Sequence, residues 1–200
     1  MDLELKTKRP LTVLISEVCC VFATLGLVAR RQLAMPLTMV GNRIRFADGT
    51  VSRIYRETVM RHLETSPRVM LAVRFRLRLI GSSRVGHALF RFESLFNTLL
   101  FAAHQGFHTK LWLTDRATDF YRGIYEWEDV ASAIEYAETL RVVLAPWAQK
   151  GTFAFRVIPG ATRPEYFRGR IPATVDISQA DEWWVPVAVT HSRPSMTTHS

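Results

Sequence analysis

The sequence predicts an α+β fold in which elements follow one another as strand, helix, strand, strand, helix, strand between Arg68 and Gly160. Three observations predict it: a first strand with strict alternation, an aromatic hairpin in the middle, and two segments whose apolar residues have helical spacing. The chain has 200 residues, of which 48% are apolar, so it is long enough to bury a core.

The first strand is expected over residues 69–80, where leucine, valine and phenylalanine alternate with arginine. Such alternation indicates a strand that is buried on one face only, because successive side chains point to opposite faces. The first helix is expected over residues 86–105, since its apolar residues recur every three or four positions and Gly106 follows as a stop signal.

The second and third strands, residues 107–114 and 120–127, form the aromatic hairpin. The second helix begins after Glu128-Asp129, which suits an N-cap at the positive end of the helix dipole, and Pro146 ends it. The last strand covers residues 152–158, where phenylalanine and valine alternate before a Pro-Gly pair. The second half of the unit thus repeats the order of the first.

Flanking segments surround this unit. An Asp-Gly turn between residues 42–46 and 51–56 predicts a preceding β-hairpin. The C-terminal extension is expected to be mostly irregular, with Trp183-Trp184 docking back onto the domain and the last residues, from His191, disordered. We therefore divide the chain into an N-terminal apolar helix and linker, an α/β domain with its core at 68–160, and an extension: residues 1–40, 41–160 and 161–200.

The apolar run from Leu11 to Ala29 leaves three interpretations open. Its nineteen residues would span a membrane, but Glu17 near the middle is costly there, on the order of 2.5–3.5 kcal/mol. A helix that packs on the domain or lies on a membrane surface is the second interpretation, and a mis-assigned start of the reading frame is the third. We expect a cytoplasmic protein, with membrane association through this run as the open question.

Charge and cysteine content exclude several classes of function. The formal net charge is +8, yet the arginines are spread along the chain without zinc-finger spacing or a glycine-rich phosphate loop, so we expect no nucleic-acid partner. Cys19 and Cys20 are adjacent, which suits neither a disulfide nor a metal site. His104 and His108 have the spacing of a metal pair, but Gly106 would break a helix between them. We expect no metal.

The order of the elements resembles the ferredoxin-like βαββαβ plait. The hairpin, with Tyr121-Arg122-Gly123-Ile124-Tyr125-Glu126-Trp127 leading into Glu128-Asp129, resembles the dimeric α/β-barrel superfamily and its YdhR-like monooxygenase branch over residues 45–160. The resemblance implies a homodimer whose two sheets face each other, with a pocket between sheet and helices in each subunit. It also implies cofactor-independent oxygenase chemistry. Haem-degrading relatives use a helical histidine, and the second helix here has none.

An independent argument also favours the homodimer. An antiparallel sheet that helices cover on one face leaves its other face open. We expect Trp112 on that open face, together with either the hairpin aromatics or Arg122 and Glu126. Exposed aromatic rows mark interfaces, so a two-fold dimer is the expected outcome.

The candidate site follows from the same alternation. His108, Lys110 and Trp112 should share one face of the second strand, and if that face also carries Arg74 and Arg76, the cavity would be electropositive and lined by aromatic rings. It would suit an acidic or phenolate ligand. The alternative is that the arginines pair with glutamates or face water. The substrate-binding candidates are Arg74, Arg76, Lys110, Tyr121, Tyr125 and Trp127.

The catalytic candidates are His108, Asn97 and Trp112, with His108 as the proton acceptor because its pKa is near neutral. The leading hypothesis is a cofactor-free, monooxygenase-like protein that binds a small aromatic or acidic molecule. A non-catalytic ligand-binding or interaction module, held at a membrane by residues 11–29, is the alternative. A third possibility is a structural relic whose pocket is filled by the Trp183-Trp184 tail. The substrate and the reaction stay open at this stage.

Overall fold

The computed structural model describes residues 33–61, 66, 68–78, 104–175 and 182–191. The apolar run from Leu11 to Ala29 and the expected first helix with Asn97 lie outside these ranges. Within the described part of the chain, no helix is long and apolar enough to cross a membrane.

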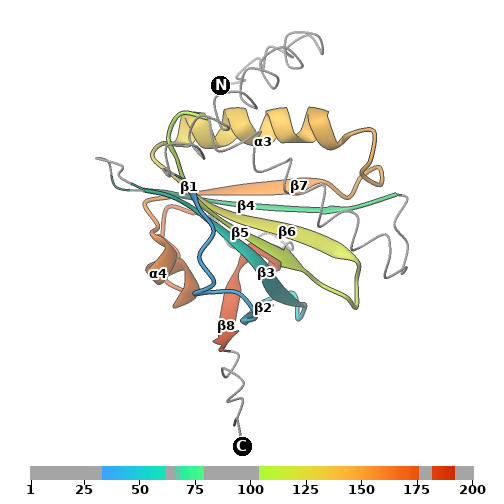
Figure 1. Cartoon of the computed structure of the whole chain (residues 1–200), viewed down its shortest axis with the longest axis horizontal. Helices are drawn as coiled ribbons and strands as arrows, with labels where there is room; N and C mark the ends of the chain where they lie inside the picture. Colours follow the sequence, from blue (N-terminus) through green and yellow to red (C-terminus); the bar gives the residue numbers. More distant parts are fainter. Residues whose placement is uncertain (1–32, 62–65, 67, 79–103, 176–181, 192–200) are drawn as a thin grey trace, which may run out of the picture.

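Four strands form the centre of one antiparallel sheet (Figure 1). In the order in which they lie side by side they are β7 (Ala154–Pro159), β4 (Val69–Arg76), β6 (Phe120–Trp127) and β5 (Phe107–Thr114). Counted along the sequence, this is the order fourth, first, third, second. Every neighbouring pair is antiparallel. The arrangement is the ferredoxin-like one, which confirms the predicted fold class.

Further strands extend the sheet beyond β5. The long strand β3 (Val51–Met60) pairs with β5, and the Asp48-Gly49 turn connects it to β2 (Arg43–Phe46), as the sequence predicted. Gly49 adopts φ +81°, a left-handed conformation that a residue without a side chain reaches at little cost. The short strand β1 (Leu33–Ala34) also pairs with β3, and β8 (Pro186–Thr190) pairs with β2.

The helix α3 (Val130–Leu144) covers one face of the sheet (Figure 1). Its N-cap is Asp129, whose carboxylate accepts hydrogen bonds from the backbone N–H and the hydroxyl of Ser132 at 2.9 and 2.7 Å. These bonds hold the pKa of Asp129 below its ordinary value. The helix packs Tyr136 and Leu140 against apolar side chains of β4 and β6. We call this side of the sheet the helix face.

The opposite face is covered by the chain's own C-terminal extension. The extension contains α4 (Arg163–Phe167), the 3-10 turn η1 (Glu182–Trp184) and β8, and Figure 1 shows α4 and β8 on the side away from α3. Trp183 and Trp184 are buried in the core on this side, which confirms that they dock back onto the domain. The Tyr166 hydroxyl donates to the Trp184 carbonyl oxygen and fastens α4 to η1. We call this side the extension face.

This arrangement corrects the premise on which the dimer was predicted. Trp112, Tyr121, Tyr125 and Trp127 all lie in the core of the helix face, so they form no exposed aromatic row. Arg122 is on the extension face, where it is buried beneath Thr50 and Ser52. Because α4 and η1 pack on that face, its described core residues are covered and give no argument for a second copy. The homodimer itself stays a prediction.

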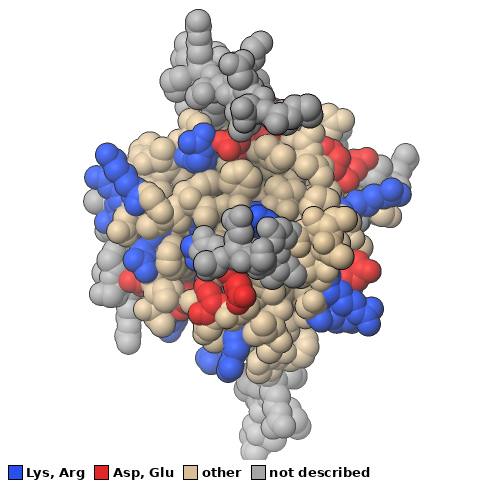
Figure 2. All heavy atoms as spheres, turned by 180° about the vertical axis from the view of Figure 1, so that it is seen from behind, with Lys and Arg blue, Asp and Glu red and all other residues tan. Residues whose placement is uncertain are grey.

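Basic side chains do not gather in one stripe on the surface seen in Figure 2. Lys and Arg atoms form separate groups there, with acidic or uncharged surface between them. Although the formal net charge is +8, a continuous basic track of the kind that follows a nucleic-acid backbone is absent from the described surface in this view.

Candidate functional site

Alternation along two neighbouring strands brings Lys110, Trp112, Gly123 and Tyr125 together on the helix face. Lys110 pairs with Tyr125 and Trp112 pairs with Gly123 in the register of β5 and β6. Residues directly opposite one another share a face of the sheet. The four positions therefore form a compact square in the middle of the sheet, under the C-terminal half of α3.

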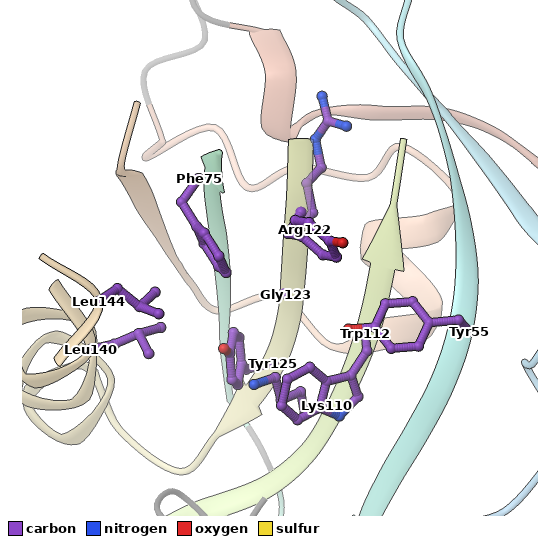
Figure 3. A pocket seen from close by; sticks show the side chains of 10 residues that line it. Tyr55, Phe75, Lys110, Trp112, Arg122, Gly123, Tyr125, Leu140 and Leu144 are labelled. Carbon is purple, nitrogen blue, oxygen red and sulfur yellow. The ribbon is translucent and has the colours of Figure 1, made fainter. Parts of the chain in front are cut away.

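A small cavity opens at this square, as Figure 3 shows. Its volume is about 20 Å³, enough for roughly one water molecule. Leu140 and Leu144 of α3 close it on the helix side, and the half-buried Tyr55 of β3 lies at its edge. The described residues that line it are Tyr55, Phe75, Lys110, Trp112, Tyr121, Arg122, Gly123, Tyr125, Leu140 and Leu144.

Lys110 is the most unusual group in this cavity. It is one of four lysines in a chain with 26 basic residues, and its side chain is 3% exposed. Its Nζ lies 3.1 Å from the centroid of the Trp112 ring and 4.7 Å from that of Tyr125 (Figure 3). Burial, together with the nearby charge of Arg56, holds the pKa of Lys110 well below its ordinary value. An amine in this environment gives up its proton more readily than a lysine in water does, and the neutral form can accept a proton.

Arg56 approaches the same aromatic ring from β3. It stands directly opposite Trp112 in the register of β3 and β5, and its Cζ lies 5.2 Å from the Trp112 ring centroid. A β-bulge between Ile54 and Arg56 places this side chain on the helix face beside Tyr55. Desolvation lowers the pKa of the Arg56 guanidinium from its ordinary value. The site therefore concentrates basic groups around one indole.

The aromatic walls are fixed by hydrogen bonds and by a glycine. The Trp112 Nε1–H donates to the Thr58 hydroxyl at 3.2 Å, and the hydroxyls of Tyr125 and Tyr136 lie 3.2 Å apart. A Cβ at Gly123 would lie 2.5 Å from a ring carbon of Tyr125, so the ring can lie over the strand only because residue 123 has no side chain. Burial raises the pKa of the Tyr125 phenol above its ordinary value.

His108, the predicted proton acceptor, is buried but does not line the cavity. A β-bulge between Phe107 and Thr109 interrupts the alternation, and Phe107 instead joins the helix-face core. Because of this bulge, simple alternation no longer places His108 on the same face as Lys110 and Trp112. Desolvation lowers the pKa of His108, although Glu126 and Glu128 act in the opposite direction. Its catalytic role stays a prediction.

The predicted arginines lie elsewhere. The Cζ of Arg74 is 4.8 Å from the Trp183 ring centroid, and the Cζ of Arg76 is 4.5 Å from that of Phe120. Neither side chain lines the cavity at Lys110. The condition for one cavity that combines these arginines with Lys110 and Trp112 is therefore not met, and a ligand-binding role of Arg74 and Arg76 stays a prediction. Arg74 instead faces the C-terminal extension, across the sheet from the cavity.

The remaining candidates divide into two groups. Tyr121 and Tyr125 line the cavity as predicted, and the Tyr121 ring stacks on Phe75 at 6.0 Å between centroids. Trp127 is fully buried against Tyr136, with 5.1 Å between ring centroids, and does not line the cavity. Asn97 lies outside the described residues. Within the described ranges no group of three His, Cys, Asp or Glu side chains could hold a metal ion.

Sequence reasoning did not assign Gly123 to this site, nor Arg56, whose guanidinium lies beside the Trp112 ring. Arg56 was assigned to a hairpin before the main unit, and only the pairing of β3 with β5 brings it to Trp112. Gly123 sits between aromatic residues in the middle of a strand, a position where a glycine is unfavourable unless another group comes close to the backbone. That signal could have been used.

No protein-family model and no curated protein sequence matches this chain. One similar solved structure is an uncharacterized ferredoxin-fold protein related to antibiotic biosynthesis monooxygenases, from Listeria monocytogenes. The match has 11% identity and a TM-score of 0.41, and it covers 57% of this chain and 66%, just under two thirds, of that one. A monooxygenase-like protein from Listeria innocua matches with 13% identity and a TM-score of 0.41, over 58% of this chain and 67% of that one.

A heme-degrading enzyme from Listeria monocytogenes matches with 9% identity and a TM-score of 0.39, over 62% of this chain and 95% of that one. The fold of this chain is ferredoxin-like. The order of its strands shows this, and it confirms the fold that the sequence resemblance implied. At such low identities the activity has to be argued from the residues of this chain.

Proposed function

We propose that the protein binds a small phenolic or similarly acidic aromatic ligand at Lys110, which takes up the ligand's proton. The observation that supports this most directly is a buried amine in contact with the Trp112 ring at the edge of a cavity. Lys110 replaces His108 as the proton acceptor in this proposal, because Lys110 lines the cavity and His108 does not.

The proton transfer would convert two neutral groups into an ion pair. The phenol O–H bond breaks, its proton adds to the Lys110 lone pair, and a phenolate remains beside an ammonium group. Such a pair is favoured inside a protein only if the charges stay in contact. Arg56 favours formation of the phenolate, because its positively charged guanidinium lies beside the same Trp112 indole.

The cavity has to widen for an aromatic ring to bind, since about 20 Å³ accommodates roughly one water molecule. Tyr55 is the natural place for this change. It is half-buried at the edge of the cavity, whereas Trp112 and Tyr125 are almost fully buried in the core. A rotation of the Tyr55 side chain would open the site without disturbing the central strands.

Titration with 4-nitrophenol tests the proposal, because the phenolate absorbs at a longer wavelength than the phenol. The wild-type protein should shift bound 4-nitrophenol to its phenolate form at a pH where the free ligand is mostly neutral. Lys110→Met should abolish this shift. Lys150→Met is the matched control, since Lys150 is exposed and outside the cavity. Equal shifts in the wild type and in Lys110→Met would refute the role of Lys110.

Whether binding leads to oxidation is a separate part of the proposal. A phenolate is electron-rich, and the family resemblance implies that such a substrate reacts with O2 without a cofactor. Oxygen uptake that depends on both the phenol and Lys110 would support a monooxygenase-like enzyme. Binding without uptake, over a panel of phenols and naphthols, would instead support the non-catalytic ligand-binding module.

Membrane association through Leu11 to Ala29 is a second proposal, motivated by the apolar run itself. Expression with and without this run, followed by membrane sedimentation, tests it. Sedimentation that requires the run supports association. If the two forms sediment identically, this run does not attach the protein to membranes.

A further inference from the structure

The cavity at Lys110 has the size for a triatomic molecule rather than for a ring. Its volume is about 20 Å³, and its wall brings the Lys110 amine next to the faces of Trp112 and Tyr125. Arg56 and Lys110 occupy diagonal positions on β3 and β5, since Arg56 pairs with Trp112 and Thr58 pairs with Lys110. Diagonal neighbours on one face are within reach of each other's long side chains.

We propose that Lys110 reversibly takes up carbon dioxide as a carbamate, and that Arg56 holds the new carboxylate. The nitrogen lone pair forms a bond to the carbon of CO2, one C=O π pair moves onto oxygen, and the nitrogen loses a proton to solvent. The product is an N-carboxylated lysine with one negative charge. No oxidant or reductant takes part, and the reverse reaction releases CO2.

The charges at the site favour this product over other amine chemistry. A protonated Lys110 and the Arg56 guanidinium carry like charges at diagonal positions, so they repel each other. A carbamate reverses the sign at position 110 and turns that repulsion into attraction. Condensation with an aldehyde, by contrast, gives an imine whose protonated form would again be cationic. The neutral amine that CO2 requires is also the form that burial favours.

Carbon-13 NMR of the full-length protein with 13CO2-equilibrated bicarbonate tests the proposal. The wild type should show a carbamate signal at neutral pH that Lys110→Met lacks. Chemical trapping with triethyloxonium, followed by peptide mass spectrometry, should place the ethylated carbamate on the peptide that contains Lys110. Lys150 serves as the internal control, because it is exposed and lies outside the cavity.

Occupancy at Lys110 should exceed that at Lys150 by more than about tenfold at neutral pH. Arg56→Gln should lower occupancy at Lys110 severalfold, and Arg56→Lys should restore most of it, because a cation returns to the same position. Circular dichroism and thermal unfolding verify that each variant is folded. Equal labelling of the two lysines, or no label on Lys110, overturns the proposal. If Arg56→Gln leaves the carbamate occupancy at Lys110 unchanged, Arg56 does not hold the carboxylate.

This inference goes beyond phenol binding and can fail separately from it. In CO2-free buffer no carbamate can form, so the 4-nitrophenol titration tests phenol binding at Lys110 by itself. The carbamate signal is measured without any phenol, so it tests carbamate formation by itself. If both proposals hold, the two ligands compete for one nitrogen, and added 13CO2 should weaken 4-nitrophenol binding in the wild type. A protein that binds the phenol but never carries the label would retain the proposed function and lose the carbamate.

Discussion

Arg163 is bound to Glu126 through both its backbone and its side chain: the backbone N–H lies 3.1 Å from Oε1 and Nε lies 3.0 Å from Oε2. The same guanidinium reaches Glu57 at 2.6 Å through Nη1. Glu57 is on β3 and Glu126 is on β6, so one residue at the start of α4 ties two strands of the sheet to the C-terminal extension. The covering of the extension face therefore depends on polar contacts as well as on Trp183 and Trp184.

Arg163→Met should destabilise the protein by about 3 kcal/mol, because it leaves two buried carboxylates without their cation. The side chains of Glu57 and Glu126 are 4% and 8% exposed. Urea unfolding measures the loss. Hydrogen exchange should show increased opening of β8 and α4, since these elements lose their tie to the sheet.

Arg168→Met is the matched control, because Arg168 ends the same helix but is exposed. It should change the free energy of unfolding by no more than about 0.5 kcal/mol. If the two methionine variants unfold at the same urea concentration, the contacts of Arg163 contribute nothing to the docking of the extension.

Lys110→Met should make the protein more stable at neutral pH, by on the order of 1 kcal/mol or more, because a methionine pays no cost for desolvating an amine. The folded protein releases the Lys110 proton at a lower pH than the unfolded chain does. Between the lowered folded pKa and the unfolded value of about 10.4, the unfolded chain binds the extra proton, so wild-type stability rises with pH.

The difference between Lys110→Met and wild type should therefore shrink as the pH rises toward about 10.4. Urea unfolding at several pH values between 7 and 10 measures this convergence. Lys150→Met, which alters an exposed lysine, should run parallel to wild type throughout. Parallel behaviour of Lys110→Met as well would show that Lys110 titrates like a lysine in water.

The elements that local patterns encode could be predicted closely. The strands at 107–114 and 120–127 have the bounds that alternation and turn residues indicated, and α3 begins after the capping Asp129. The order of the four central strands was implied by the resemblance to the ferredoxin-like plait. The bounds of these two strands and the start of α3 depend on residues that are close together in the sequence, which is why they could be predicted.

The faces of the site could not be predicted, because they depend on bulges and on distant segments. A bulge changes which face a side chain occupies, and those at Phe107/Thr109 and Ile54/Arg56 left no signal in the alternation. The pairing of β3 with β5 is a long-range contact, so Arg56 could not be placed at Trp112. Trp183 and Trp184 were expected to dock back onto the domain, but the sequence did not indicate which face they cover or that Tyr166 of α4 joins them.

Gly123→Ala should destabilise the protein by about 1–3 kcal/mol, because the added methyl group would lie within 2.8 Å of two ring carbons and the hydroxyl oxygen of Tyr125. The ring has to move, and the cavity at Lys110 changes shape with it. Thermal unfolding measures the cost. In a Tyr125→Leu background the same substitution should cost clearly less; an unchanged cost would place the clash elsewhere.

Arg122→Lys should cost about 2 kcal/mol although it keeps the charge. The guanidinium donates to Ser52 Oγ at 2.6 Å through Nη1 and to Thr50 Oγ1 at 2.7 Å through Nη2, and its side chain is fully buried. A lysine ammonium is a single point and cannot occupy both donor positions. Guanidinium chloride unfolding measures the loss, with Arg53→Lys on the exposed side of β3 as the control. Should both variants keep wild-type stability, the forked geometry at Arg122 would not be what joins β6 to the β2–β3 hairpin.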